Sequence, residues 1–283
     1  MPEPAELVRF YDDGYSQDAV RAATYSRWRA LSAIGKADHV IVLCSRAGVR
    51  PASTLEVGCG DGALLSELHR RGFGGRLSGV EISQAAVAIA RERPEIDAVA
   101  VYDGAHLPRQ ARAHDLGIVS HVLEHVPDPT ALIAEVARVC GAVLVEVPLE
   151  ANLSARRKRK REHAAEVGQL HRLDRRDVRQ LVARAGLSIA CELEDPLPLE
   201  VHRFFAATGP TRAYATVKWA LRAGLHRHAP FAARRLFTLH YACLCVPREG
   251  PSSNGVEAAS SRAGLPALSA GSPRNAGIDY AQR

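Results

Sequence analysis

Apolar residues recur along the chain with two different spacings, and the alternation of these spacings predicts both strands and helices. Compact apolar runs bounded by glycine, proline or an acidic residue predict seven strands, at residues 51–57, 76–81, 98–102, 115–120, 142–147, 187–193 and 238–246. Apolar residues three and four positions apart predict helices at residues 18–44, 63–71, 83–93, 129–139, 175–185 and 211–226. Strands that alternate with helices predict an α/β fold with a doubly wound sheet.

Composition and charge narrow the class of protein. The 283 residues are 47% hydrophobic, which is enough to bury the core of one ordinary domain with appendages. Net charge is +6, but part of this excess comes from the run at residues 156–161, so a general nucleic-acid surface is not implied. The six cysteines form no C-x-x-C pair, and the N-terminus lacks a signal peptide's basic start and apolar stretch. We therefore expect reduced thiols and a cytoplasmic protein.

A glycine-rich turn follows the first predicted strand and leads directly into a helix. Glycines allow backbone N–H groups to approach a ligand closely, and a helix N-terminus adds the positive end of a dipole, so the turn predicts a nucleotide-sized cradle. The residues Glu56, Gly58, Gly60 and Gly62 fit the pattern E-x-G-x-G-x-G. This pattern resembles motif I of the class I S-adenosylmethionine (SAM)-dependent methyltransferases.

The same turn also fits the dinucleotide fingerprint G-x-G-x-x-A of NAD(P) enzymes, with Ala63 as its last residue. Two acidic residues favour SAM. Glu56 lies on the strand itself, and Asp61 would be an awkward neighbour for a pyrophosphate but is tolerable beside a sulfonium and an ammonium group. No Tyr-x-x-x-Lys pair for hydride transfer is evident. An NAD(P)-dependent oxidoreductase remains the alternative hypothesis.

The resemblance implies a Rossmann-like, mostly parallel, seven-stranded sheet, whose last strand is antiparallel and inserted between the fifth and sixth. It also implies SAM as the cofactor, bound by the motif I residues Glu56, Gly58, Cys59, Gly60 and Gly62. Glu81 ends the second strand about 20 residues past the glycines, where a carboxylate grips a ribose diol. Ile82 would lie against the adenine. Asp103 would accept from the adenine amine, although an Asp-Gly pair is equally typical of a simple turn.

The most distinctive stretch of the sequence follows the fourth strand, where His121, Glu124 and His125 spell H-x-x-E-H. Taken literally, this is a zinc motif. Two histidine ligands four residues apart need a helical turn, but His121 follows a strand and Pro127 closes the segment, so we expect no metal. The stretch instead resembles motif IV of small-molecule methyltransferases. That resemblance places Ser120 and His121 beside the cofactor, while His125 is more simply a packing or turn residue.

Four residues are candidates for a catalytic base. Methyl transfer from SAM is an in-line displacement, and a hydroxyl acceptor must lose its proton near the transition state. Glu146 and Glu150 lie at the carboxyl end of the fifth strand, which is the ligand edge of such sheets, but a solvated strand end explains them equally well. His171 lies near a histidine position of the family that Gln169 occupies here. The sequence does not choose among His121, Glu146, Glu150 and His171.

The resemblance and the breaks in alternation together divide the chain into five expected parts. Residues 1–50 form a helical cap that roofs the cofactor, with Tyr25, Trp28 or Arg29 near its methionine end, or that simply packs on the core. Residues 51–150 form the SAM-binding core, 151–186 a basic lid and helix, and 187–247 the rest of the sheet with a helical acceptor-pocket insertion. Residues 248–283, rich in Ser, Ala, Gly and Pro, predict a disordered tail.

The predicted function is methyl transfer from SAM to a small-molecule acceptor or to a glycan- or lipid-linked one. Ser154 could cap a helix that opens with the basic run at residues 156–161. That run is either a solvated surface or a lid that recognises phosphate, an anionic glycan or an acidic membrane face, so an anionic acceptor and a membrane-surface role stay open. Aromatic residues do not interleave with it, which ranks an RNA-associated binding domain low. The sequence does not indicate an oligomeric state.

Overall fold

A computed structural model describes Asp12, Tyr15 and residues 19–108 and 110–248 of the chain. Its centre is a seven-stranded sheet with the order β3-β2-β1-β4-β5-β7-β6. The strands are β1 (Ser53–Val57), β2 (Arg76–Glu81), β3 (Ala98–Val101), β4 (His114–Ser120), β5 (Cys140–Leu149), β6 (Leu187–Asp195) and β7 (Leu239–Pro247). The first five strands pair in parallel, and β7 runs antiparallel between β5 and β6. The predicted fold is therefore confirmed, including the place of the last strand. The predicted tail lies outside the described residues, apart from Arg248.

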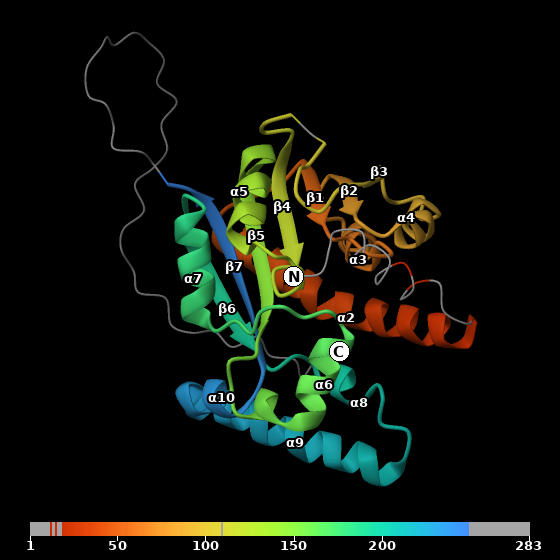
Figure 1. Ribbon diagram of the computed structural model, residues 1–283, viewed down its shortest axis with the longest axis vertical. Coiled ribbons are helices and arrows are strands. Elements are labelled where there is room, and N and C mark those ends of the chain that lie inside the picture. The colour runs from red at the N-terminus through yellow and green to blue at the C-terminus, as the bar shows by residue number, and fades with distance from the viewer. Residues whose placement is uncertain (1–11, 13–14, 16–18, 109, 249–283) are drawn as a thin grey trace. The chain divides into compact units, whose positions relative to one another are not determined.

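Helices cover both faces of the sheet (Figure 1). They are α2 (Ala19–Arg46), α3 (Ala63–Arg70), α4 (Gln84–Arg91), α5 (Pro129–Val139), α6 (Lys158–Glu166), α7 (Arg175–Arg184), α8 (Leu199–Arg203), α9 (Gly209–His228) and α10 (Pro230–Leu236). Apolar residues of α2 and α3 pack on one face, where Leu116, Ile118 and Leu144 point. Those of α5 and α7 pack on the other, against alternate strand residues such as Val119 and Val145. This division follows from the two-residue period of strands.

Capping residues fix where several of the helices begin. Asp128 accepts from the N–H of Ala131 at the start of α5, and Asp174 forms a reciprocal capping box with Asp177 at the start of α7. The prediction that Ser154 caps a helix is wrong. Its hydroxyl donates to Asn152 Oδ1, which also caps Ala155 N–H, so Ser154–Arg156 form one 3₁₀ turn, and α6 begins only at Lys158.

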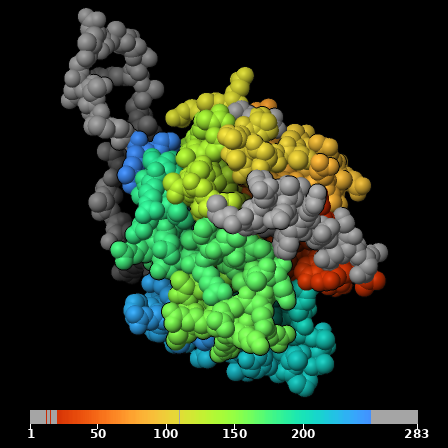
Figure 2. Space-filling view, viewed as in Figure 1, coloured from red at the N-terminus to blue at the C-terminus, as the bar shows by residue number. Residues whose placement is uncertain are grey.

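Four helices, α6 and α8 to α10, gather beyond the carboxyl ends of β4 and β5 (Figure 1), and Figure 2 shows α6 and the adjoining turn over this end of the molecule. The sequence predicted α9, although the helix is longer than expected at both ends, with Thr208 as its N-cap. It did not predict α8 or α10. These short helices have weak local patterns, and their positions depend on what they pack against.

Candidate active site

The glycine turn lies at the carboxyl end of β1 and faces the segment that follows β4. Gly58, Gly60 and Gly62 all have positive φ angles, of 74°, 54° and 76°, which favour glycine. A Cβ atom on Gly58 would lie only 2.5 Å from Cγ2 of Val122. Gly58 is therefore required by close approach as well as by conformation. The turn and the start of the H-x-x-E-H segment form one continuous wall, as their positions on the neighbouring strands β1 and β4 imply.

Glu81 lies at the same edge and is bonded to the turn. One carboxylate oxygen accepts from the N–H of Gly60 at 3.0 Å, and the other accepts from those of Ile82 and Ser83. Burial raises the pKa of Glu81, and these backbone bonds oppose that rise. The carboxylate is thus held rigidly at the turn, where a ribose diol could donate to its remaining lone pairs.

The two residues predicted to contact adenine lie close together. A Cβ on Gly104 would lie 3.5 Å from Ile82 Cγ2, so the loop after β3 passes beside Ile82. The Asp103 side chain is exposed and accepts from the backbone of Ala105 and His106 and from the His106 ring, which lowers its pKa to about 2. These bonds make Asp103 the cap of its own turn. Its contact with adenine stays a prediction.

Glu56 has a carboxylate oxygen that lacks a protein partner. The side chain is buried beside the glycine turn, and Oε2 accepts no hydrogen bond from any described residue. Burial raises the pKa of Glu56 to about 8, although the Lys36 ammonium acts in the opposite direction. An unpaired buried carboxyl oxygen beside a glycine cradle is suited to the ammonium group of an amino-acid tail, and the residues present therefore fit SAM. Cys59 is buried in the same turn, and its pKa is raised by burial.

The α2 helix reaches the turn from the other side. Arg29 Nε donates to Asp61 Oδ2 at 2.7 Å, so a residue of the predicted roof is tied to the cradle. Tyr25 and Trp28 instead approach Phe205, with ring centroids 6.2 and 6.3 Å away. Of the three residues predicted for the methionine end, the structure brings Arg29 to motif I and places the other two rings beside Phe205.

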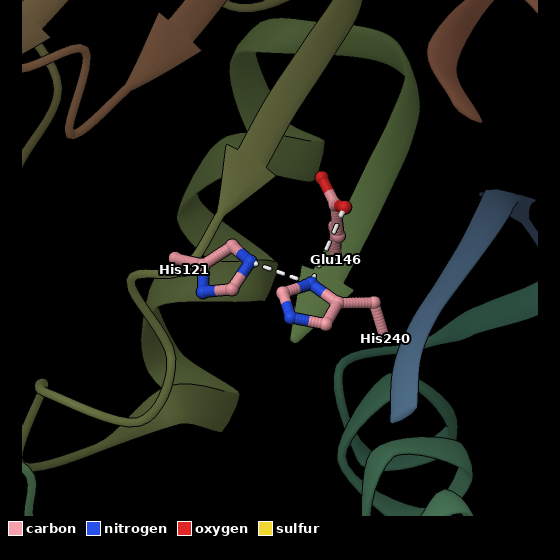
Figure 3. Close-up of side chains that lie close together, drawn as sticks. All are labelled: His121, Glu146 and His240. Atoms are coloured by element: carbon pink, nitrogen blue, oxygen red, sulfur yellow. Dashed lines mark hydrogen bonds and ion pairs between the residues drawn. The ribbon is translucent and has the colours of Figure 1, made fainter. Parts of the chain in front are cut away.

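His121 is the residue immediately after β4, and its backbone adopts a left-handed conformation with φ of 58°. Such a conformation is uncommon for histidine and is found where a side chain must be directed to a particular place. The Nε2 atom of His121 lies 3.1 Å from Nδ1 of His240 (Figure 3). The Nδ1 atom of His121 lies 3.3 Å from Oε1 of Glu124. Burial lowers the pKa of His121 to about 3 and that of His240 well below its usual value. Both rings are therefore neutral at physiological pH.

Glu146 lies behind this histidine pair and is completely buried. Its Oε1 lies 2.9 Å from Nδ1 of His39, and its Oε2 accepts from the Ser120 hydroxyl at 2.8 Å. The other ring nitrogen of His39 lies 2.8 Å from Asp195 Oδ2. Burial alone would lower the pKa of His39, but the two carboxylates outweigh it and raise this pKa to about 10. The solvated strand end considered for Glu146 is therefore wrong, because the residue belongs to a buried charged network.

The other two candidates for the catalytic base, Glu150 and His171, form hydrogen bonds that involve residues 169–171. Gln169 Nε2 donates to Glu150 Oε2 at 2.6 Å, and His171 Nε2 lies 2.9 Å from the carbonyl of Val126. The N–H groups of Leu170 and His171 both donate to the carbonyl of Glu124. Residues 169–171 therefore pack directly on the turn that contains H-x-x-E-H. The His171 ring is engaged there, because its Nε2 donates to the carbonyl of Val126.

His121, Glu146 and His240 each offer a possible metal ligand, with ligand atoms within 4.8 Å of one another. Two features oppose a dication at this position. Both oxygens of Glu146 already have partners, and the charges of His39 and Lys36 act on the same carboxylate. The H-x-x-E-H pattern does not supply a metal site of its own. Residues 121–127 form bends and turns, so His121 and His125 do not share a helical face. The donor set therefore fits hydrogen bonding and proton transfer better than metal binding.

Sequence reasoning missed His39, Asp195 and His240. His39 is a lone histidine among the apolar residues of a helix, and His240 alternates with apolar residues in a strand, so neither carries a local motif. Only a buried polar residue in each apolar pattern could have drawn attention to them. Their partners come from elements 107, 156 and 119 residues away along the chain.

A sheet of this order, with a glycine turn after β1 and an acidic residue at the end of β2, is typical of class I SAM-dependent methyltransferases. A family profile described as "Methyltransferase domain" matches residues 28–192, which is more than half of the sequence. The chain belongs to this methyltransferase family. The match decides between the two interpretations of the glycine turn in favour of SAM.

Several curated relatives share part of the sequence. The ubiquinone biosynthesis O-methyltransferase of Acinetobacter baylyi is 32% identical over 92 residues, covering 30% of this chain and 38% of the relative. The enzyme of the same name from Albidiferax ferrireducens is 27% identical over 150 residues, covering 50% of this chain and 54% of the relative. The chain thus spans between about two fifths and just over half of these relatives.

Solved structures show the same fold at low identity. The geranyl diphosphate C-methyltransferase of Streptomyces coelicolor, in complex with Mg²⁺, geranyl diphosphate and S-adenosylhomocysteine, superposes with a TM-score of 0.60 at 15% identity, covering 88% of this chain and 99% of that one. A possible histamine N-methyltransferase of Thermotoga maritima gives 0.56 at 14% identity, covering 86% and 100%. In the described part of this chain, no helix is long and apolar enough to cross a membrane.

Proposed function

We propose that this protein transfers the methyl group of SAM to a hydroxyl oxygen of a small-molecule acceptor, with the His121–His240 pair receiving the proton. The observation that carries this proposal is the contact between two neutral imidazoles, His121 directly after β4 and His240 on β7, next to the wall that Val122 shares with Gly58. Oxygen as the methylated atom is supported by the curated relatives, which are named O-methyltransferases.

The cofactor would be held by residues of the first two strands and their turns. Glu81 would accept from the two ribose hydroxyls, the backbone of Gly58 to Gly62 would curve around the amino-acid tail, and Glu56 Oε2 would accept from its ammonium group. When bound, SAM supplies an electrophilic methyl carbon. The chain then has to orient the acceptor oxygen in line with the carbon–sulfur bond and to exclude water.

The histidine pair would remove the hydroxyl proton as the oxygen–carbon bond forms and the carbon–sulfur bond breaks. One N–H is shared between His121 Nε2 and His240 Nδ1, so a proton taken up by one ring can be passed to the other. Glu146 is a poorer candidate, because His39 and Ser120 occupy both of its oxygens and leave neither of them for a substrate hydroxyl. Ser120 and Glu146 instead fix the end of β4 from which His121 projects.

Isotope transfer tests this function directly. The full chain is incubated with methyl-labelled SAM and a panel of phenolic and aliphatic alcohols, with the corresponding amines and thiols as comparison acceptors. We expect label in a methyl ether and a requirement for His121. Label transferred with equal efficiency to amines or thiols, and insensitive to His121→Gln, would contradict both the hydroxyl acceptor and the base, because these nucleophiles need less proton removal.

A further inference from the structure

A buried arginine on α9 has no acidic partner. The Arg222 side chain belongs to a residue that is only 9% exposed, and its Nε atom is buried without a hydrogen-bond partner. Guanidinium groups are seldom buried unless a carboxylate or another anion neutralises them. No described carboxylate forms an ion pair with Arg222, so its charge is not compensated within the described part of the chain.

The neighbour of Arg222 is itself a neutral group. Arg222 Nη1 lies 3.1 Å from Nε2 and 3.3 Å from Nδ1 of His202. Because Nε2 donates to the carbonyl of Pro196 at 2.6 Å, only Nδ1 is left to accept from the guanidinium. Burial lowers the pKa of His202, and the adjacent guanidinium acts in the same direction. The Phe237 ring lies 5.5 Å from the guanidinium carbon. A neutral imidazole and an aromatic ring orient the arginine but do not neutralise it.

Three further cations surround this position. Lys218 is one helical turn before Arg222 on α9, and Arg157 and Lys160 belong to the start of α6, which lies beside α8 and α9 (Figure 1). Burial lowers the pKa of Lys218, and the charges of Arg222, Lys160 and Arg157 lower it further. None of the four cations forms an ion pair with a described carboxylate, whereas Lys158 in the same basic run pairs with Glu162. Three cations near a buried guanidinium repel it and one another, which is an arrangement that an anion would stabilise.

The position of this cluster connects it to the candidate active site. Trp219 Nε1 donates to the carbonyl of Leu197, and His202 binds the carbonyl of Pro196, so α8 and α9 both grip the segment after β6. Asp195, immediately before that segment, is the partner of His39 behind the histidine pair. An anionic group held by Arg222 would therefore lie against the segment that follows Asp195, at the end of the sheet where the acceptor binds.

We propose that Arg222, together with Lys218, Lys160 and Arg157, forms a binding site for a phosphate-class anion, either phosphate or diphosphate, carried by the methyl acceptor. The existence of the anion site is independent of the proposed function. Its assignment to the acceptor rests on that function. Within the basic run, the site distinguishes Arg157 and Lys160, whose charges act on Lys218, from Lys158, which pairs with Glu162.

Calorimetry with inorganic diphosphate at constant ionic strength tests the site on the full chain. We expect binding by the wild type and a loss of about 10- to 100-fold in affinity for Arg222→Met, since charge-assisted hydrogen bonds are removed. Lys160→Gln should also weaken binding. The matched controls Arg227→Gln on α9 and Lys158→Gln on α6 remove equal charge and should leave the affinity unchanged. Equal losses in the variants and their controls, or no binding by the wild type, would overturn the proposal.

Thermal unfolding separates a binding role from a structural one. If Arg222 binds an anion, Arg222→Met should unfold at the same temperature as the anion-free wild type or at a higher one. Diphosphate should then raise the Tm of the wild type but not that of Arg222→Met. A variant that is less stable while the wild type ignores diphosphate would make Arg222 a structural residue. Lys160→Gln, an exposed change, keeps the test open if Arg222→Met does not fold.

Two further measurements identify the source of the anion and distinguish a failure of the anion site from a failure of the proposed function. Vesicles of phosphatidylcholine with and without phosphatidylglycerol are compared with soluble diphosphate. Vesicle binding that Arg222→Met abolishes would identify a lipid headgroup, binding of diphosphate alone would identify a soluble acceptor, and vesicle binding that Arg222→Met retains without diphosphate binding would overturn the site. S-adenosylhomocysteine affinity is measured in parallel. Its retention without diphosphate binding would contradict the anion site alone, whereas its absence would contradict the proposed function.

Discussion

The imidazole Nδ1 of His39 on α2 lies 2.9 Å from Oε1 of Glu146 near the end of β5, and neither side chain is exposed to solvent. This buried pair joins α2, which carries His39, to β5, which carries Glu146 next to the histidine pair. Asp195 and Ser120 complete its hydrogen bonds, so that the charges of both residues are satisfied within the protein. The four residues therefore connect α2, β4, β5 and β6 through buried hydrogen bonds.

Breaking this pair should destabilise the protein strongly. His39→Leu would leave Glu146 charged and buried, and the loss of one partner of a buried pair costs about 3–5 kcal/mol. Chemical denaturation should show this loss in the free energy of unfolding. The exposed His228→Gln variant is the control and should change stability by less than about 0.5 kcal/mol. If the double variant His39→Leu/Glu146→Gln is no more stable than His39→Leu, the uncompensated charge is not the cause.

The stability of the protein should also depend on alkaline pH through His39. Its folded pKa is raised to about 10, above the ordinary value of 6.5, so its contribution is fully present below pH 6.5 and is lost as pH rises towards 10. The free energy of unfolding should decline over this interval more steeply in the wild type than in His39→Leu. Denaturation curves at several pH values provide the measurement, and identical slopes for the two proteins would disprove the assignment.

Glu81→Ala should weaken S-adenosylhomocysteine binding about 10- to 100-fold, because hydrogen bonds to a charged group are lost. The fold should survive, since α3 and the glycine turn keep their own backbone bonds. Calorimetry checks the affinity and circular dichroism checks the fold. Glu92→Ala, at an exposed position next to α4, is the control. Unchanged affinity in Glu81→Ala would remove this residue from the cofactor site.

His121→Gln should lower kcat about 10²–10⁴-fold for a hydroxyl acceptor with little change in S-adenosylhomocysteine affinity. His125→Gln, four residues along, is the matched control. Because the pKa of His121 is lowered to about 3, the ring stays neutral well below pH 6, and the wild-type rate should not fall with a midpoint near 6.5. A pH profile of kcat with such a midpoint, or equal losses in both variants, would argue for another base.

Gly58→Ala should fold poorly or lose the cofactor site. The positive φ at this position is strained for any residue other than glycine. The new methyl group would also lie 2.5 Å from Cγ2 of Val122. We expect a destabilisation of about 1–3 kcal/mol. Gly209→Ala is the control, because nothing lies within 4 Å of a Cβ at that position. Equal Tm values for the two variants would show that the close approach to Val122 is not maintained in solution.

The sequence by itself determined the strands, most of the helices and the edge at which the glycine turn and Glu81 meet, while the place of the last strand followed from the family resemblance. Strand and helix periods, capping residues such as Asp128 and Asp174, and the glycines before α3 are local features, and each acts within a few residues of itself. Glu81 could be placed because its distance from the glycines is fixed by one strand–helix–strand unit.

Only the tertiary structure decided which polar groups meet behind and beside that edge. His39 lies 107 residues before Glu146 and 156 residues before Asp195 in the sequence. Arg222 is notable only because no carboxylate among the described residues forms an ion pair with it after folding. Burial and charge pairing depend on the positions of several elements at once. A residue's own neighbours in sequence carry no record of them, since the free energy of a buried charge is set by what surrounds it in space.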